Sequence, residues 1–122
     1  MISIAVCDDN EITAQEISEK VKQCCPIEAE VSVFYHIKDI LFSIHNENKL
    51  FDIIFMDPPY NHEFENRVLE YLSSSPMVTE DTLIIIEASK ETDFDWLSDA
   101  GFHMIKEKVY KTNKHIFAGK GA

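Results

Sequence analysis

The sequence has no long apolar stretch and no basic leader. Its longest apolar runs are short, such as Leu83 to Ile86, whereas a helix that spans a bilayer needs about 20 apolar residues. No basic segment followed by a long apolar core opens the chain, so we expect no signal peptide. Because 45% of the 122 residues are hydrophobic, we expect one globular domain, residues 1–122, located in the cytoplasm.

Cysteines and basic residues are also scarce. The three cysteines, Cys7, Cys24 and Cys25, form no CxxC pair, so neither a disulfide framework nor a zinc site is indicated. Eleven Lys and Arg residues face 22 Asp and Glu residues, which gives a net charge of −11. Nucleic-acid binding normally requires a basic surface, so we expect neither nucleic acid nor a membrane as a partner, although a local basic patch could survive.

Hydrophobic periodicity predicts strands and helices that alternate along most of the chain. Apolar runs and period-two alternation indicate strands, and apolar residues at helical spacing indicate amphipathic helices. The expected strands are 1–7, 30–35, 51–56 and 82–87, followed by a hairpin of strands 103–111 and 114–118. The expected helices are 11–24, 37–45, 63–72 and 94–100. This order predicts an α/β fold, an open sheet between layers of helices with an antiparallel last strand.

Three carboxylates stand where two of the expected strands end. Asp8 and Asp9 end the first strand, and Asp57 ends the third. If these strands are neighbours in a parallel sheet, their carboxyl ends meet where such sheets bind ligands. Three carboxylates repel one another unless a hard cation lies between them, and Mg²⁺ prefers such oxygen ligands. The pattern therefore predicts a Mg²⁺ site, with the alternative that these are strand-end residues and that Asp9 or Asn10 caps the next helix.

The stretches "ISIAVCDDN" and "FDIIFMD" resemble the first half of a response-regulator receiver domain, in particular receivers of LytTR-type regulators. This resemblance implies that Asp57 accepts a phosphoryl group and that Asp8 and Asp9 hold Mg²⁺, with the carbonyl of Pro59 completing the site. The receiver pattern stops after Asp57. The fourth strand ends in Glu87 where a receiver has a hydroxyl residue, and no Lys-Pro pair follows.

Asp57-Pro58-Pro59-Tyr60 resembles the DPPY motif of S-adenosylmethionine-dependent amino-methyltransferases. With "DTLIIIEAS" and "KEKVYKTNKHIF", the stretch from about residue 51 to 117 is similar to the end of the 16S rRNA guanine-N2 methyltransferase family. The resemblance implies that the Asp carboxylate and a proline carbonyl accept hydrogen bonds from the target amine, while the Tyr ring stacks on an extruded base.

Glycine is too rare for the cofactor site of that family. Such methyltransferases bind S-adenosylmethionine at a glycine-rich turn after their first strand, where only glycine lets the backbone approach the ligand. The only glycines here are Gly101, Gly119 and Gly121, all near the end of the chain. We therefore expect no S-adenosylmethionine binding, and we interpret residues 57–60 as a vestigial catalytic motif.

Taken together, these patterns favour an engineered chimera of a receiver-like segment, residues 1–57, and a methyltransferase-like segment, residues 58–122. Such a hybrid of flavodoxin-like and Rossmann-like folds predicts the strand order 2-1-3-4-6-5, counted along the chain, with strand 6 antiparallel. We expect no evolved catalytic activity and no required cofactor, with Mg²⁺ possible. The alternatives are a phosphorylatable receiver of a two-component system and a truncated S-adenosylmethionine-dependent rRNA guanine-N2 methyltransferase.

The hairpin at the end of the chain has a consequence for packing. It replaces the helix that covers one sheet face in a receiver, so we expect a partly bare apolar face near Ile84, Ile86 and the hairpin. Exposed apolar patches of this kind favour association. The sequence therefore predicts a homodimer or a domain-swapped oligomer.

Overall fold

The computed structural model describes residues 2–8, 10–24, 28–46, 50–57 and 69–121. Its elements are β1 (Ile2–Asp8), α1 (Glu11–Cys24), β2 (Ala29–Phe34), α2 (Ile37–Asn46), β3 (Ile53–Asp57), β4 (Leu83–Ser89), β5 (Phe102–Val109) and β6 (Asn113–Lys120). Residues 69–74 are also helical. Within these described residues, no helix is both long enough and apolar enough to span a membrane.

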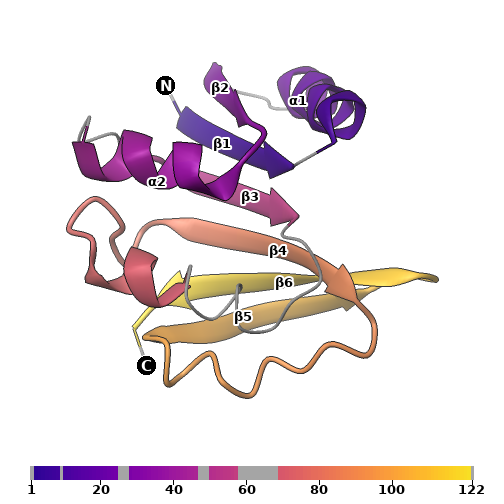
Figure 1. The fold of residues 1–122 in the computed structure, drawn as a ribbon. Coiled ribbons are helices and arrows are strands. Elements are labelled where there is room, and N and C mark those ends of the chain that lie inside the picture. Colours follow the sequence, from indigo (N-terminus) through magenta and orange to yellow (C-terminus); the bar gives the residue numbers. More distant parts are fainter. Residues whose placement is uncertain (1, 9, 25–27, 47–49, 58–68, 122) are drawn as a thin grey trace.

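The six strands form one sheet in the order β2-β1-β3-β4-β6-β5 (Figure 1). The pairs β1–β2, β1–β3 and β3–β4 are parallel, and β6 runs antiparallel to both β4 and β5. The predicted α/β fold, its strand order and its antiparallel sixth strand are therefore confirmed. This is a Rossmann-like α/β architecture.

Strand β1 lies inside the sheet and is buried from Ile4 to Asp8. A parallel strand covered on both faces is expected to be an unbroken apolar run, as this one is up to its terminal carboxylate. Helix α1 begins directly after it because Asn10 caps it. The Asn10 side-chain oxygen accepts a hydrogen bond from the Thr13 amide at 3.0 Å, and its carbonyl accepts one from the Ala14 amide at 2.9 Å.

One face of the sheet, which we call the α2 face, is closed over β3, β4 and the part of β6 that carries Ile116 and Ala118. Its core contains Ile54, Met56, Ile84, Ile86 and Ile116 from the strands, all at most 2% exposed. Helix α2, the helical residues 69–74 and the segment 94–100 cover these side chains. They contribute Ile40 and Ile44, Leu69 and Leu72, and Phe94, Leu97 and Ala100 to the same cluster. Full burial of each large side chain stabilises the fold by about 1.5–3 kcal/mol.

The opposite face, which we call the α1 face, is covered only in part. Helix α1 lies against β1 and β2 at one edge of the sheet, while β5 and β6 form the other edge (Figure 1). Alternation along the strands places Phe55, Ile85 and Phe117 on this face, and all three are half-buried. Among the described residues the apolar surface of β3, β4 and β6 is therefore less covered here than on the α2 face.

Two expectations are wrong in detail. The face is not bare at Ile84 and Ile86, because these residues are 0% and 1% exposed and belong to the buried core cluster. The hairpin part of this expectation agrees with the structure, because Met104 and Val109 of β5, which the register places on the same face, are 43% and 56% exposed. Ile105 of the hairpin is 57% exposed. The predicted association is not tested by this and stays a prediction.

The expected helix at 94–100 is a series of turns. The Leu97 amide donates to the Phe94 carbonyl at 3.0 Å, and the Ala100 amide donates to the Leu97 carbonyl at 3.1 Å. A segment this short does not offset the cost of helix nucleation. Its Asp and Ser residues also favour turns, and the Asp95 amide donates to the Asp93 side chain at 2.8 Å.

Candidate functional site

The candidate site lies at the carboxyl edge of the parallel strands, where β1 and β3 end together. Asp8 and Asp57 are partners in the β1–β3 register, so the two sequence positions singled out above are neighbours across two strands. Asp8 is 2% exposed, and its Oδ1 accepts a hydrogen bond from the Asn10 amide at 2.9 Å. This bond ties the end of β1 to the first turn of α1, and it makes Asp8 part of the turn as well as of the edge.

The side chains of the remaining predicted site residues lie outside what the structure describes. Asp9, Pro58, Pro59 and Tyr60 lie outside the described residues, and of Asp57 only the position in β3 is known. In the part of the chain that the structure describes, no three His, Cys, Asp or Glu side chains gather as a metal site would require. The Mg²⁺ site of Asp8, Asp9 and Asp57, and Asp57 as a phosphoacceptor, are therefore untested.

A row of polar residues crosses the sheet at the level of Asp57. Met56 pairs with Ile86, so Asp57, one residue further on, is level with Glu87. Glu87 pairs with His115, and His115 pairs with Lys108. Two strand spacings of about 4.8 Å put the backbone of His115 about 10 Å from that of Asp57. All of these positions lie on the α1 face by alternation.

Glu87, His115 and Lys108 of this row contact neighbouring side chains from β3, β6 and the hairpin turn. Asn113 Nδ2 donates to Glu87 Oε1 at 2.5 Å. The His115 ring meets Phe55 edge-on, with centroids 5.7 Å apart, and the Tyr110 ring at 4.9 Å. Lys108 Nζ lies 5.3 Å from the centroid of the Tyr110 ring. The row therefore ends in an ordered aromatic and cationic group.

Sequence patterns did not single out this group. A histidine without metal spacing, a tyrosine near a turn and lysines on alternate positions are typical of an ordinary solvated hairpin. Only the register, which sets β6 beside β4, brings His115 and Lys108 level with the end of β3. The one available signal was the alternation within the hairpin, which places Lys106 and Lys108 on one face of their own strand.

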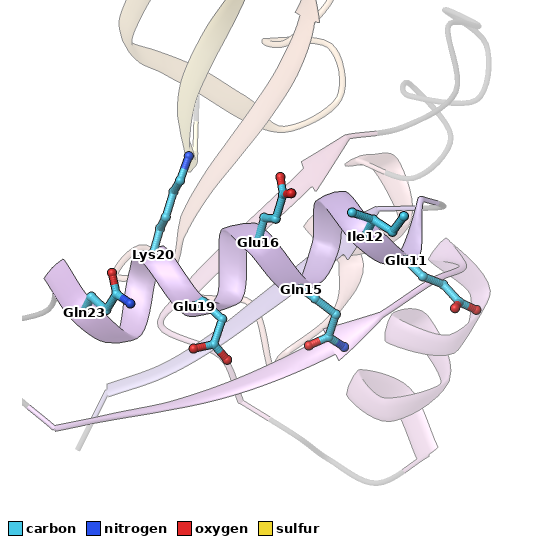
Figure 2. Close-up of a pocket in the computed structure, with 7 residues that line it drawn as sticks. All are labelled: Glu11, Ile12, Gln15, Glu16, Glu19, Lys20 and Gln23. Carbon is cyan, nitrogen blue, oxygen red and sulfur yellow. The ribbon is translucent and has the colours of Figure 1, made fainter.

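A pocket of about 630 Å³ lies elsewhere, along α1. Figure 2 shows Gln15 and Glu19 on one side of the helix and Glu16 and Lys20 on the other. All seven lining residues belong to α1, and they run from its first turn, at Glu11, to its last. This surface follows the helix rather than the carboxyl edge of the sheet, so we assign it no part in the chemistry at Asp57.

Comparison with known proteins identifies a single family along the chain. The family described as Conserved hypothetical protein 95 matches residues 1–119. A curated relative, the uncharacterized methylase RP545 of Rickettsia prowazekii, is 37% identical over 67 residues. That match covers 55% of this chain and 28% of the relative, so the matched stretch is well under half of that protein.

Solved structures share the fold. A conserved hypothetical protein of Streptococcus pyogenes superposes with a TM-score of 0.64 at 19% identity, covering 95% of this chain and 70% of that one. The protein-(glutamine-N5) methyltransferase of Alicyclobacillus acidocaldarius gives a TM-score of 0.59 at 14% identity, covering 100% of this chain and 81% of that one. At these identities the likeness shows the architecture alone.

These findings overturn the chimera hypothesis. One family match continues across Asp57, so there is no junction between residues 1–57 and 58–122, and neither a designed origin nor a receiver is supported. The hypothesis failed because "FDIIFMD" is a buried parallel strand that ends in Asp, and unrelated α/β families share that pattern.

The expectations that the chain is no enzyme and that it uses no S-adenosylmethionine are also wrong. The curated relative is described as a methylase, and a methyltransferase family implies S-adenosylmethionine as cosubstrate. The absence of a glycine-rich turn after β1 was a weak argument, because the family match runs through this turn from residue 1 to residue 119. With residues 1–119 matched throughout, the chain belongs to the Conserved hypothetical protein 95 family.

Proposed function

We propose that this chain carries the amine-binding edge of an S-adenosylmethionine-dependent methyltransferase whose target is the exocyclic amino group of an RNA base. The observation that carries the proposal is Asp57-Pro58-Pro59-Tyr60, which begins at the last residue of β3 in a chain whose family match runs through the motif. That this chain has the activity of its relatives is part of the proposal, since the match covers 28% of the curated relative.

In the proposed reaction, the residues of this chain orient the amino group that receives the methyl group. A carboxylate and a backbone carbonyl are both hydrogen-bond acceptors, so Asp57 and a carbonyl of the following prolines hold the two N–H groups of an amino substituent. The nitrogen lone pair is thereby directed away from the ring of the base. S-adenosylmethionine supplies an electrophilic methyl group when it is bound. Tyr60 stacks on the base, which has to leave its helical stack to reach such a site.

The residues at the carboxyl edge fit a cationic cosubstrate. S-adenosylmethionine carries a sulfonium and an ammonium group, and the edge presents the buried carboxylate of Asp8 beside the position of Asp57. Opposite charges attract strongly where water is largely excluded. Asp8 is therefore the described residue that we assign to the cosubstrate, and Asn10, which caps α1, keeps the turn next to it in place.

The experiment measures transfer of a labelled methyl group from S-adenosylmethionine to unmodified ribosomal RNA. We expect the wild-type protein to label the RNA and Asp57→Ala to lose most of that activity, because the amine loses its charged acceptor. Asp81→Ala is the matched control, since Asp81 is an exposed carboxylate away from the edge. A folded wild-type protein that neither binds the cosubstrate by calorimetry nor labels RNA would contradict the proposal. The cytoplasm remains the proposed compartment.

A further inference from the structure

The charge of the chain is unevenly distributed. Residues 102–122 hold five lysines and one acidic residue, Glu107, in a chain whose net charge is −11. The conclusion that total charge disfavours nucleic acid therefore does not describe this end of the molecule. Proteins that bind single-stranded nucleic acid combine a local basic surface with aromatic side chains on which the bases stack.

Two of these lysines are used within the fold. Lys114 is 8% exposed, lies 3.2 Å from Glu107 and is placed over the Phe94 ring on the α2 face. Lys120 Nζ donates to the carbonyls of Ser75 and Val78 at 3.1 and 2.8 Å. The exposed cations on the hairpin are Lys106, Lys108 and Lys111.

The hairpin also offers an aromatic surface beside these cations. Tyr110 is 40% exposed, its ring contacts that of His115, and Lys108 lies over it. We call Lys108, Tyr110 and His115 the hairpin shelf. Its backing is fixed, because Phe55 supports the His115 ring and the Tyr110 amide donates to the Asn113 carbonyl at 2.8 Å.

The hairpin shelf lies on the same face of the sheet as Asp57. His115 is level with Asp57 and about two strand spacings, or about 10 Å, from it along the sheet. Enzymes that modify an extruded base commonly contact the nucleotides on either side of it. A strand whose target base reaches Asp57 would thus bring a flanking nucleotide over the hairpin.

We propose that the hairpin shelf positions the nucleotide next to the methylated one in single-stranded RNA. Tyr110 stacks on the flanking base, and Lys108 contacts its phosphate, while His115 holds the Tyr110 ring in place. Stacking on an exposed ring requires a base outside a duplex, so single-stranded RNA is the fitting occupant. That the adjacent nucleotide is methylated follows from the proposed function. That the hairpin binds single-stranded RNA is inferred from the hairpin residues alone.

The test is a titration of the intact protein with a short fluorescein-labelled single-stranded RNA of mixed sequence, without cosubstrate, followed by anisotropy. We expect Tyr110→Ala to weaken binding on the order of tenfold. Tyr110→Phe, which keeps the ring, stays close to wild type. Lys108→Ala lowers the slope of log affinity against log salt by about 0.7, as expected for one lost contact to a single-strand phosphate, and Lys108→Arg restores it.

The controls separate this inference from folding and from the proposed function. Lys22→Ala removes an equal charge from the last turn of α1 and should leave both affinity and salt slope unchanged. Equal binding by Tyr110→Ala and Tyr110→Phe, or a duplex of the same sequence bound as well as the single strand, would overturn the shelf. Calorimetry with S-adenosylmethionine is independent of the shelf. If the protein binds S-adenosylmethionine but the shelf variants bind RNA like the wild type, only this inference is contradicted. If the shelf variants lose RNA binding but the protein does not bind S-adenosylmethionine, only the proposed function is contradicted.

Discussion

The two faces of the sheet differ in what covers them. On the α2 face, α2 and the chain from 69 to 100 bury the apolar residues of β3 and β4 and Ile116 and Ala118 of β6, so this face supplies most of the described hydrophobic core, although Met104 and Val109 of β5 are 43% and 56% exposed there. On the α1 face, one helix covers β1 and β2, and the strands beyond it carry half-buried apolar residues and the polar row that ends at Lys108. The same strands thus serve stability on one side and leave room for recognition on the other.

Adjacent residues of β4 make this comparison quantitative. Ile84 is 0% exposed on the α2 face, whereas Ile85 is half-buried on the α1 face. We expect Ile84→Ala to lower the free energy of unfolding by about 2–5 kcal/mol, through lost burial and the cavity it leaves. Ile85→Ala should cost less than half as much. Urea denaturation followed by circular dichroism measures both, and equal losses would show that the two faces are equally closed.

Substitution of Gly101, which directly precedes β5, measures how tightly the chain packs against Ser73. Its φ is +90°, and an added Cβ would lie 2.9 Å from the Cβ of Ser73. Gly101→Ala should therefore destabilise the fold by about 1–3 kcal/mol, from backbone strain and the clash. Gly121→Ala is the matched control, because its φ is +116° and no atom lies within 4 Å of the added Cβ. If thermal melting shows the same loss for both variants, the packing argument at Ser73 is wrong.

The cap of α1 should contribute less. Asn10→Ala removes the oxygen that accepts from the Thr13 amide, and we expect a loss of about 1 kcal/mol. Asn10→Ser keeps an acceptor and should retain most of the stability. Because Asn10 also adjoins Asp8, the Ala variant should weaken cosubstrate binding more than Ser does. An unchanged melting temperature for Asn10→Ala would exclude the cap as the start of α1.

Association through exposed apolar residues is the prediction with the smallest expected energy. Ile105 is 57% exposed on the hairpin, so Ile105→Glu should leave the fold intact and shift a homodimer toward monomer. Light scattering over a wide concentration range measures the shift. A wild-type protein that stays monomeric throughout would refute the homodimer and the domain-swapped oligomer alike.

Much of the fold could be predicted from the sequence because local patterns and global topology agree. Buried runs such as the one in β1, and the alternation of β4, indicate their elements directly, with boundaries accurate to one or two residues. A helix was predicted at 94–100 because Phe94 and Leu97 are three residues apart, as on one face of a helix. In the structure both side chains are buried by tertiary packing of a segment made of turns. Which face is covered depends on where that segment folds back, and no local pattern encodes this.

The candidate site was predictable only at the strand ends. Asp8 and Asp57 follow apolar runs, so their proximity could be inferred from a parallel sheet alone. The hairpin shelf could not, because it requires the register of β6 against both β4 and β5. Family membership was misjudged for a physical reason as well, since binary patterning specifies a fold class and not an activity.

The most direct test of the account is to follow backbone amide NMR shifts during a titration with S-adenosylmethionine. The account predicts that the shifts of Asp8, Asn10 and Asp57 move together, because the cosubstrate lies at the carboxyl edge of β1 and β3. Shifts confined to the pocket on α1, at Glu19 and Gln23, would contradict the assignment of the site, and a titration without any shifts would contradict the proposed function.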